Sequence, residues 1–227
     1  IKESKSGIDY IKSFDTTNFP IKVAAEIKNL NMEEHLSKRD IKFSSKFINY
    51  ARIAAKEAFV DSGLNECEFN HDRFGVYIAS GIGGIEKLED GLINDNINPY
   101  FIPSTLINLA SSQVAIDLQA RGSNIAITSA CASGSNAIGE AFWKIRHGYE
   151  DVILAGCSES SITKKTVEGF SVMRALYNGE DLKRASIPFD EERKGFVIGE
   201  GTAILVLEEL EHAKKRIPIQ ERKRIFT

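Results

Sequence analysis

Cys131 is the residue of this sequence whose type and surroundings best suit covalent chemistry. It follows the apolar run 123–130 and opens the turn CASGS, which is made of small residues and precedes an amphipathic segment. The first turn of a helix has free backbone N–H groups and the positive end of the helix dipole, which favour a thiolate and can receive an oxyanion. The pattern therefore predicts a nucleophilic thiol, with the backbone N–H of Cys131 as one oxyanion donor.

A free cysteine is more often a small buried hydrophobic residue than a nucleophile, and position alone leaves both interpretations of Cys131 open. The other two cysteines have less suitable surroundings, because Cys67 lies in a polar loop and Cys157 lies at the end of an apolar run. We predict a structural role for both. Three cysteines without CxxC spacing indicate neither a disulfide framework nor a zinc site, so no metal is expected.

Strands and helices alternate around this turn, which predicts a layered α/β sheet. The strand 123–130 leads into the turn, a helix over about 136–147 follows, and a strand at 151–159 completes the unit. Both strands are continuously apolar, as expected of strands that helices cover on both faces. The helix residues expected to face the core are Ile138, Ala141, Phe142 and Ile145.

The pattern predicts four further elements outside this unit. They are a helix over 43–63 with Gly63 as its C-terminal stop, a strand over 73–80 that enters the glycine turn 81–84, a helix over 104–118, and a last strand GTAILVLEEL followed by a charged helix. No low-complexity segment or short repeat interrupts them, so the chain is expected to fold as one layered unit.

The composition is that of an ordinary folded domain, with 42% hydrophobic and 27% charged residues. A formal net charge of −3 gives no global positive field, so neither nucleic acid nor a membrane is an expected partner. The longest apolar run is far shorter than a membrane span, and IKESKSGIDY contains no signal-peptide core. We therefore expect a cytoplasmic protein, or one of a plastid-type organelle if its source is eukaryotic.

Four ordered motifs resemble the β-ketoacyl-acyl carrier protein synthases of the elongating type: ITSACASGSNAIGEAF, DVILAGCSES, GFSVMRAL and RASIPFDEERKGFVIGEGTAILVLEELEHAKKR. Upstream, SGIDYIKSFDT, ASGIGG and FIPSTLINLA also resemble segments of that family. The resemblance implies the thiolase-like fold, a layered α-β-α architecture of two similar halves. Residues 1–216 match the N-terminal half, whereas 217–227 form a tail of unclear assignment.

The resemblance also implies the chemistry. Cys131 falls on the family's active-site cysteine, which takes an acyl chain from acyl carrier protein (ACP) as a thioester. Malonyl-ACP then loses carbon dioxide, and its carbanion attacks the acyl-enzyme. Both substrates are carried on the phosphopantetheine of ACP, and no other cofactor is expected. Leu106 and Phe170 fall where the family lines its acyl pocket, although ordinary core packing is an equally suitable interpretation of both.

This sequence departs from the family pattern in several places. The family's two catalytic histidines belong to its second half, and the histidines here, His35, His71, His147 and His212, stand in charged or turn-like settings. We assign none of them a role; His147 is about four helical turns from Cys131. The family normally begins with a strand and a helix before the segment that here starts at Ile1, and that strand lies in the middle of the sheet. We therefore expect either that another segment fills the central position or that the sequence is incomplete. Lys194 replaces an acid and Cys157 a glycine.

Partners follow from the same resemblance. ACP is acidic, and a basic docking region of the family matches Lys38, Arg39 and Lys42, with Arg174 as a further candidate. A solvated helix face is the alternative for these charges. The family forms homodimers, commonly through the strand that here spans 123–130. Two other functions remain open: a polyketide-type ketosynthase, and a non-catalytic half-domain that serves as an interaction unit.

Overall fold

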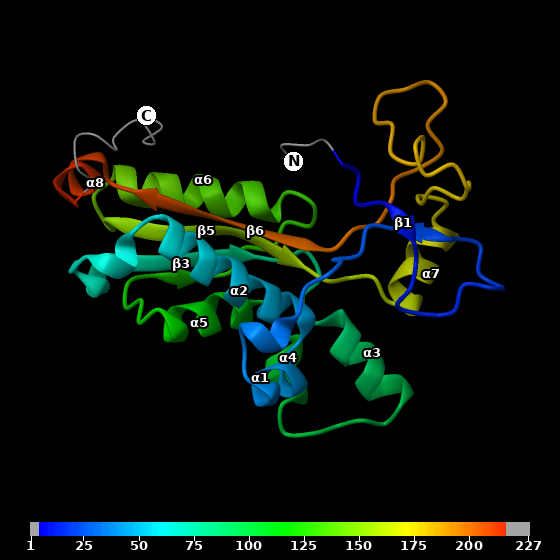
Figure 1. Ribbon diagram of the computed structural model, residues 1–227, viewed down its shortest axis with the longest axis horizontal. Helices are drawn as coiled ribbons and strands as arrows, with labels where there is room; N and C mark the ends of the chain where they lie inside the picture. The colour runs from blue at the N-terminus through cyan, green and yellow to red at the C-terminus, as the bar shows by residue number, and fades with distance from the viewer. Residues whose placement is uncertain (1–4, 217–227) are drawn as a thin grey trace.

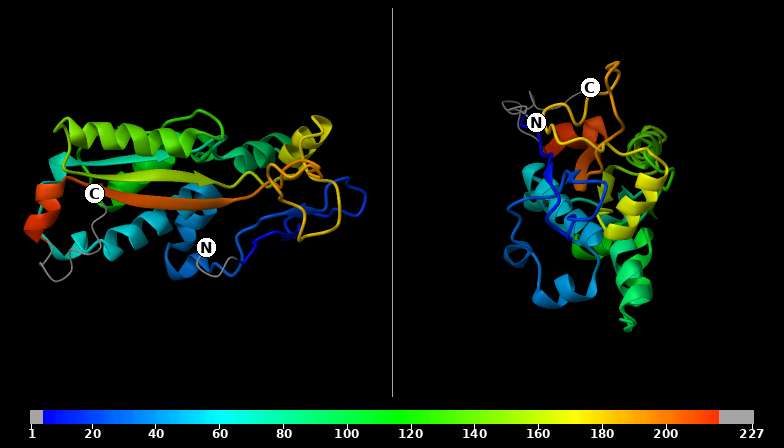
Figure 2. Two further views of the ribbon diagram at one scale, coloured as in Figure 1. Left: turned by 90° about the horizontal axis from the view of Figure 1, so that it is seen from above. Right: turned by 90° about the vertical axis from the view of Figure 1, so that its right-hand side faces the viewer.

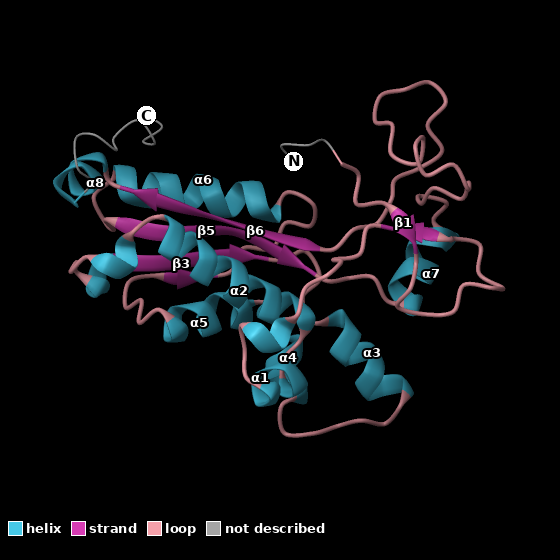
Figure 3. Ribbon diagram, in the orientation of Figure 1, coloured by secondary structure: helices cyan, strands magenta, loops and turns pink. Residues whose placement is uncertain are grey.

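A four-stranded mixed sheet forms the centre of the computed structural model, which describes residues 5–216 (Figures 1 and 3). Its order is β4-β3-β5-β6, with β3 (Phe74–Ala79) and β5 (Val152–Glu159) in the middle. The short strand β4 (Asn124–Ile125) runs parallel to β3, and β6 (Gly201–Glu208) runs antiparallel to β5. The expected α/β sheet is confirmed.

Helices cover both faces of this sheet, which explains why its central strands are apolar throughout. On one face lie α2 (Lys46–Asp61) and α5 (Asn108–Asp117), and on the other lies α6 (Ser133–Arg146) (Figure 1). Every residue of β3 is buried. The largest core cluster joins α2, β3, α5 and β5; its members include Phe47, Ile48, Ala51, Phe74, Val76, Ile78, Val114, Val152 and Leu154.

The sheet has no vacant central position within residues 5–216, and no other segment fills one. β3 and β5 pair directly over six residues, from Phe74 opposite Val152 to Ala79 opposite Cys157. Their hydrogen-bonded ladder leaves no room for a strand between them. Within residues 5–216 the free edges of the sheet instead belong to β4 and β6, its outermost strands.

The strand expected over 123–130 is much shorter than the apolar pattern suggests. Only Asn124 and Ile125 join the sheet, opposite Val76 and Tyr77, and both are exposed. Because β4 has no neighbour on its outer side within the described chain, nothing continues the ladder as the chain turns toward the helix. The expected coverage on both faces therefore holds for β5 and is wrong for β4.

Two helix predictions needed correction. The segment 104–118 is interrupted, since α4 (Phe101–Thr105) ends before the extended residue Leu106 and α5 begins afterwards. The helix expected from about 136 starts three residues earlier, at Ser133, which brings its first turn next to Cys131. Phe142, expected in the core, is 46% exposed because Ala141 occupies the sheet-facing position.

A second packing unit extends the molecule beyond the carboxyl end of β5, giving it an elongated outline (Figure 2). It contains the hairpin of β1 (Asp9–Tyr10) and β2 (Val23–Ala24) and the helix α7 (Lys164–Val172). Ile11, Ile21, Ile162, Val167 and Leu176 are buried there. The remaining helices are α1 (Lys38–Phe43), α3 (Ile85–Ile93), α8 (Leu210–Arg216) and three short 3₁₀ segments, η1 (Met32–Glu34), η2 (Leu64–Glu66) and η3 (His71–Arg73). In the part of the chain that the structure describes, no helix has the length and hydropathy needed to cross a membrane.

Candidate active site

Cys131 lies on an exposed turn two residues before α6. Its neighbour Ala130 has a φ of 52°, a left-handed conformation that residues with a Cβ atom adopt infrequently. Such a backbone persists only where the surrounding contacts enforce it, and these residues cluster at functional sites. The alternative that Cys131 is a small buried hydrophobic residue is therefore wrong, and the tight turn that the small residues predicted is confirmed.

Ser133 provides one of these contacts. Its side chain is fully buried, and its hydroxyl donates to the Ala130 carbonyl at 2.6 Å while accepting from the Ser129 N–H at 2.8 Å. Asn136 then donates from Nδ2 to the Ser129 hydroxyl at 2.6 Å. Sequence reasoning missed these roles. The signal was present, because serine and asparagine at a helix start commonly bond to the local backbone.

The glycine turn after β3, residues 81–84, packs beside the turn at residues 129–133, which carries the candidate nucleophile Cys131 and is called the nucleophile turn below. Gly83 has a φ of 78°, a conformation that glycine adopts without a steric penalty. A Cβ atom at Gly84 would overlap the Ser104 carbonyl oxygen, so the turn lies directly against α4. A Cβ atom at Gly81 would be 3.5 Å from the Ala130 carbonyl oxygen. The two turns expected from sequence therefore meet at the same end of the sheet.

Glu159, the last residue of β5, bonds to the glycine turn. Its Oε2 atom accepts hydrogen bonds from the N–H groups of Gly81 at 2.8 Å and Ile82 at 3.1 Å. Its Oε1 atom accepts from the Ser161 hydroxyl at 2.6 Å. Sequence reasoning assigned this carboxylate no function.

Cys157 belongs to the supporting structure rather than to the exposed site. It is partly buried on β5, and a Cβ atom at Gly134 would lie 2.9 Å from its Cβ, so the first turn of α6 rests on it. Burial raises the pKa of the Cys157 thiol, and the nearby charge of Glu159 raises it further. A thiol with a raised pKa is a poor nucleophile near neutral pH, in agreement with the structural role predicted for it.

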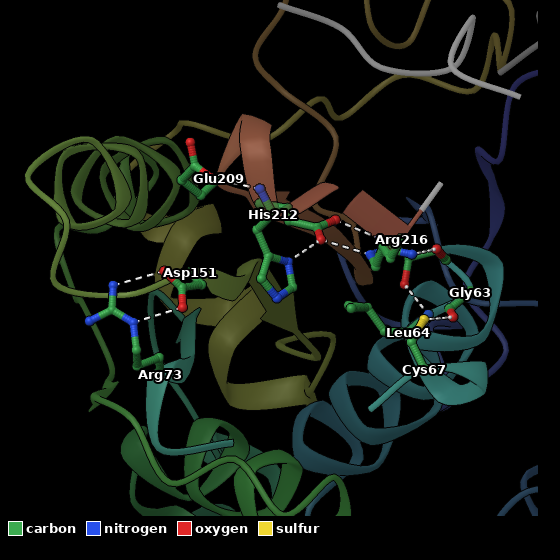
Figure 4. A network of polar contacts seen from close by, with 10 residues as sticks. Gly63, Leu64, Cys67, Arg73, Asp151, Glu209, His212 and Arg216 are labelled. Atoms are coloured by element: carbon green, nitrogen blue, oxygen red, sulfur yellow. Dashed lines mark hydrogen bonds and ion pairs between the residues drawn. The ribbon is translucent and has the colours of Figure 1, made fainter. Parts of the chain in front are cut away.

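Cys67 and His212 lie in a polar network near α8 (Figure 4). The Cys67 thiol donates to the Gly63 carbonyl at 3.0 Å, and His212 Nδ1 lies 2.6 Å from a carboxylate oxygen of Glu208. Arg216 donates to that carboxylate from Nε at 2.7 Å and to the Ser62 carbonyl at 2.8 Å. The network ties α8 to the end of α2. Its role is structural, as predicted for Cys67.

Three of the four histidines lie at the end of the sheet opposite Cys131. Glu208, the partner of His212, pairs with Val152 at the first residue of β5, whereas the active-site turns adjoin its last residue. The seven steps along β5 span roughly 23 Å. His71 precedes β3 and His147 caps the far end of α6, so both share the remote position. None of these three can contact the Cys131 thiol; the fourth, His35, caps η1.

The two predicted pocket residues belong to different parts of the molecule. Leu106 is 45% exposed between α4 and α5, whereas Phe170 is partly buried in the second packing unit. The ring of Phe170 contacts that of Phe196 edge to face, with centroids 5.5 Å apart. Phe196 in turn lines an open hollow of about 740 Å³. Leu106 belongs neither to the cluster of Phe170 nor to the lining of that hollow, so their shared pocket stays a prediction.

The predicted docking residues lie on α1 and after α7. Lys38, Arg39 and Lys42 are exposed on α1, where Lys38 pairs with Glu33 at 3.6 Å and Arg39 donates to the Tyr100 hydroxyl at 2.9 Å. Arg174 is exposed after α7 with a φ of 55°. Their charges are therefore accessible, which suits docking and a solvated helix face alike.

The sheet and the turn together define a class: layered α/β proteins that present an exposed cysteine thiol at the start of a helix. A family model for the "Beta-ketoacyl synthase, N-terminal domain" matches residues 1–213. The chain therefore belongs to the β-ketoacyl synthase family. The family predicted from the sequence motifs is confirmed.

Similar proteins agree with this assignment. The chain is 42% identical over 217 residues to 3-oxoacyl-[acyl-carrier-protein] synthase 2 of Staphylococcus aureus, covering 93% of this chain and 54% of that protein. The protein of the same description from Coxiella burnetii is 42% identical over 219 residues, covering 93% and 53%. The chain thus spans about half the length of these relatives.

Solved structures show the same fold. A β-ketoacyl synthase from Burkholderia phymatum superposes with a TM-score of 0.83 at 28% identity, over 95% of this chain and 55% of that one. A type II polyketide synthase (PKS) complex of an acyl-carrier protein with its ketosynthase bound to the hexaketide superposes with a TM-score of 0.81 at 31% identity, over 94% and 53%. The thiolase-like fold expected from the resemblance is confirmed.

Proposed function

We propose that this chain forms the acyl-accepting half of a β-ketoacyl-ACP synthase of fatty-acid elongation. The observation that carries the proposal is the exposed Cys131 on its constrained turn at the start of α6, in a chain that is 42% identical to 3-oxoacyl-ACP synthases. The thiolate attacks the carbonyl of acyl-ACP, and N–H groups at the turn receive the tetrahedral oxyanion. The carrier's thiolate leaves, takes up a proton, and the acyl chain stays on Cys131 as a thioester.

The full reaction of the family is a decarboxylating Claisen condensation. Malonyl-ACP loses carbon dioxide, its carbanion attacks the acyl-Cys131 thioester, and β-ketoacyl-ACP leaves two carbons longer. His71, His147 and His212 lie too far from Cys131 to serve this step. We therefore propose that the 227-residue chain alone is acylated but does not condense.

The substrates are proposed to arrive on the phosphopantetheine of ACP, with no metal or other cofactor taking part. A solved relative forms a complex with its acyl-carrier protein, which supports a carrier as partner. The exposed charges of Lys38, Arg39, Lys42 and Arg174 suit an acidic carrier. We propose a cytoplasmic location, where such carriers are met.

We also propose a homodimer formed through the free edge of β4. Ile125 is 40% exposed there, and an unpaired edge is a ready site for a second strand. Ile125→Lys is expected to convert dimer to monomer in sedimentation velocity, whereas Val60→Lys on the exposed end of α2 should leave the dimer intact. A wild-type monomer at high concentration would contradict the proposal.

A polyketide-type ketosynthase is the second candidate function, favoured by the 31% identity to the type II ketosynthase complex. The higher identity to the fatty-acid enzymes makes elongation the better supported function. A non-catalytic half-domain is the third candidate, and it would leave Cys131 without acyl chemistry.

Acyl transfer tests the proposal directly. Radiolabelled acyl-ACP, or cerulenin, which the family's cysteine attacks, is expected to label the folded chain stably at Cys131. Cys131→Ala should abolish that label, whereas Cys67→Ala should retain it. A folded chain without label would favour the non-catalytic candidate. Addition of malonyl-ACP should release no product. Turnover at an ordinary enzymatic rate would instead show that a histidine of this chain takes part in condensation.

A further inference from the structure

Glu159 carries a carboxylate that accepts hydrogen bonds from two segments, residues 80–82 after β3 and residues 160–161 after β5. Oε2 accepts from the N–H groups of Gly81 at 2.8 Å and Ile82 at 3.1 Å and from the Ser80 hydroxyl at 3.3 Å. Oε1 accepts from the Ser161 hydroxyl at 2.6 Å. No lysine, arginine or histidine within the described chain forms an ion pair with it. The Glu159 carboxylate therefore accepts hydrogen bonds from neutral donors only, within the described chain.

Gly81 lies next to both the Glu159 carboxylate and the nucleophile turn. A Cβ atom at Gly81 would be 3.1 Å from Glu159 Oε2 and 3.5 Å from the Ala130 carbonyl oxygen, so both oxygens lie against the side of Gly81 that a side chain would occupy. Ala130 immediately precedes Cys131 and has the left-handed φ of 52°. Its carbonyl oxygen also accepts from Ser133 at 2.6 Å, so the turn is held from both sides.

The contacts of Glu159 depend on the length of its side chain. Its partners are backbone N–H groups and hydroxyls, and a neutral side chain of the same length with an acceptor oxygen could accept the same N–H donors. The reach of the side chain, rather than its charge, is therefore the property that these contacts need.

We propose that Glu159 is a positioning residue for Cys131. By holding Gly81 and Ile82, it presses the glycine turn against the Ala130 carbonyl and keeps the thiol directed over the first turn of α6. The functional importance of positioning Cys131 rests on the proposed acyl transfer. The experiment that tests the positioning does not depend on acyl transfer, because alkylation by iodoacetamide needs only an accessible thiol and neither an acyl group nor a carrier.

Two substitutions separate reach from charge. Glu159→Asp keeps the charge but withdraws the carboxylate by about 1.5 Å, one carbon–carbon bond. Glu159→Gln keeps the length and an acceptor oxygen but removes the charge. The second-order rate constant for alkylation of Cys131 would be followed by peptide mass spectrometry between pH 6 and about 9, a window around the cysteine pKa. Cys67 provides an internal reference, and Glu168→Asp and Glu168→Gln on the exposed face of α7 are matched controls.

Glu159→Asp is expected to lower the Cys131 rate constant by about five- to tenfold, since small misplacements of reacting groups have effects of at least this size. Glu159→Gln should stay within about twofold of wild type, because it keeps the side-chain length and an acceptor oxygen for the N–H groups of Gly81 and Ile82. The Cys67 rate and both Glu168 variants should not change. Amide exchange over 129–133 should be faster in Glu159→Asp than in wild type.

Three outcomes would overturn the inference. Wild-type reactivity in Glu159→Asp would show that the reach is not needed, and an equal loss in both Glu159 variants would show that the charge is. A lower free energy of unfolding in urea with an unchanged Cys131 rate constant would leave Glu159 a structural role only. Failure of acyl-ACP to label the wild-type chain would contradict the proposed function. It would not affect the inference about Glu159, which the alkylation rate constants decide separately.

Discussion

At the scale of single residues, the candidate site depends on backbone groups that side chains hold in place. Ala130 adopts a conformation unusual for its type, and the buried Ser133 hydroxyl donates to the Ala130 carbonyl and accepts from the N–H of the preceding Ser129. The result is an exposed thiol on a rigid support. Residues that fix a nucleophile in this way have effects on both stability and reactivity.

Ser133→Ala tests this support. Loss of the hydroxyl leaves the Ser129 N–H without its partner and the Ala130 carbonyl with only the Ser133 N–H, so the free energy of unfolding should fall by about 1–2 kcal/mol. Urea denaturation measures it, and alkylation of Cys131 should slow in parallel. Ser135→Ala, two residues on and exposed, is the control and should change the free energy of unfolding by less than about 0.5 kcal/mol. Equal effects from the two serines would contradict the role given to Ser133.

At the scale of helices and strands, close contacts of small residues set the spacing of the layers. Gly156 on β5 faces the Ala203 carbonyl of β6, and Gly134 lets α6 approach Cys157. Gly139, in the interior of the same helix, has no atom within 4 Å of a Cβ position. The chain therefore contains glycines that packing requires and at least one that it does not.

Replacing glycine by alanine should therefore change the free energy of unfolding in opposite directions at Gly156 and Gly139. Gly156→Ala would force a methyl group onto the Ala203 carbonyl and should lower the free energy of unfolding by more than about 2 kcal/mol. Gly139→Ala should raise it by about 0.5–1 kcal/mol, because alanine restricts the unfolded chain and suits a helix interior. Thermal and urea unfolding of the two variants provide the comparison. A destabilised Gly139→Ala would mean that α6 packs more tightly there than the structure shows.

At the scale of the whole molecule, one end of the sheet carries the candidate site and the other carries stabilising ion pairs. One end gathers the nucleophile turn, the glycine turn and Glu159, while the other is fastened by ion pairs (Figure 4). There Arg73 binds Asp151 through two hydrogen bonds, at 2.7 and 2.8 Å, and so connects the start of β3 to the start of β5. The guanidinium of Arg73 holds the pKa of Asp151 below its ordinary value.

This lowered pKa predicts a pH dependence of stability. A carboxylate with a lower pKa in the folded state stabilises the fold above its unfolded-state pKa of about 3.9, and that contribution disappears as the pH falls through the folded-state value. Asp151→Asn should therefore be less stable than wild type at pH 7 and 5, with the difference closing below about pH 4. Urea titrations at each pH measure it. Asp72→Asn, in the exposed pair with Arg121, should show little difference at any pH.

Patterns carried by neighbouring residues were sufficient to predict the family, the nucleophile and the alternation of strands with helices. Cys131, the small residues after it and the apolar run of β5 are local signals, because side-chain periodicity and turn chemistry depend on adjacent positions. The helix α2 with its stop at Gly63, the strand β3 and the turn 81–84 were predicted for the same reason, and the structure confirms them.

Only the tertiary structure decided what depends on strand pairing. The sequence could not place β3 directly beside β5, and that pairing brings Glu159 to Gly81, 78 positions apart in the chain. It also could not show that β4 is short and exposed, because an apolar run reads alike at the centre and at the edge of a sheet. The sequence thus identified Cys131 as the candidate nucleophile. The packing of separate segments determined how that thiol is held, because contacts between distant residues follow from the sheet order rather than from any local pattern.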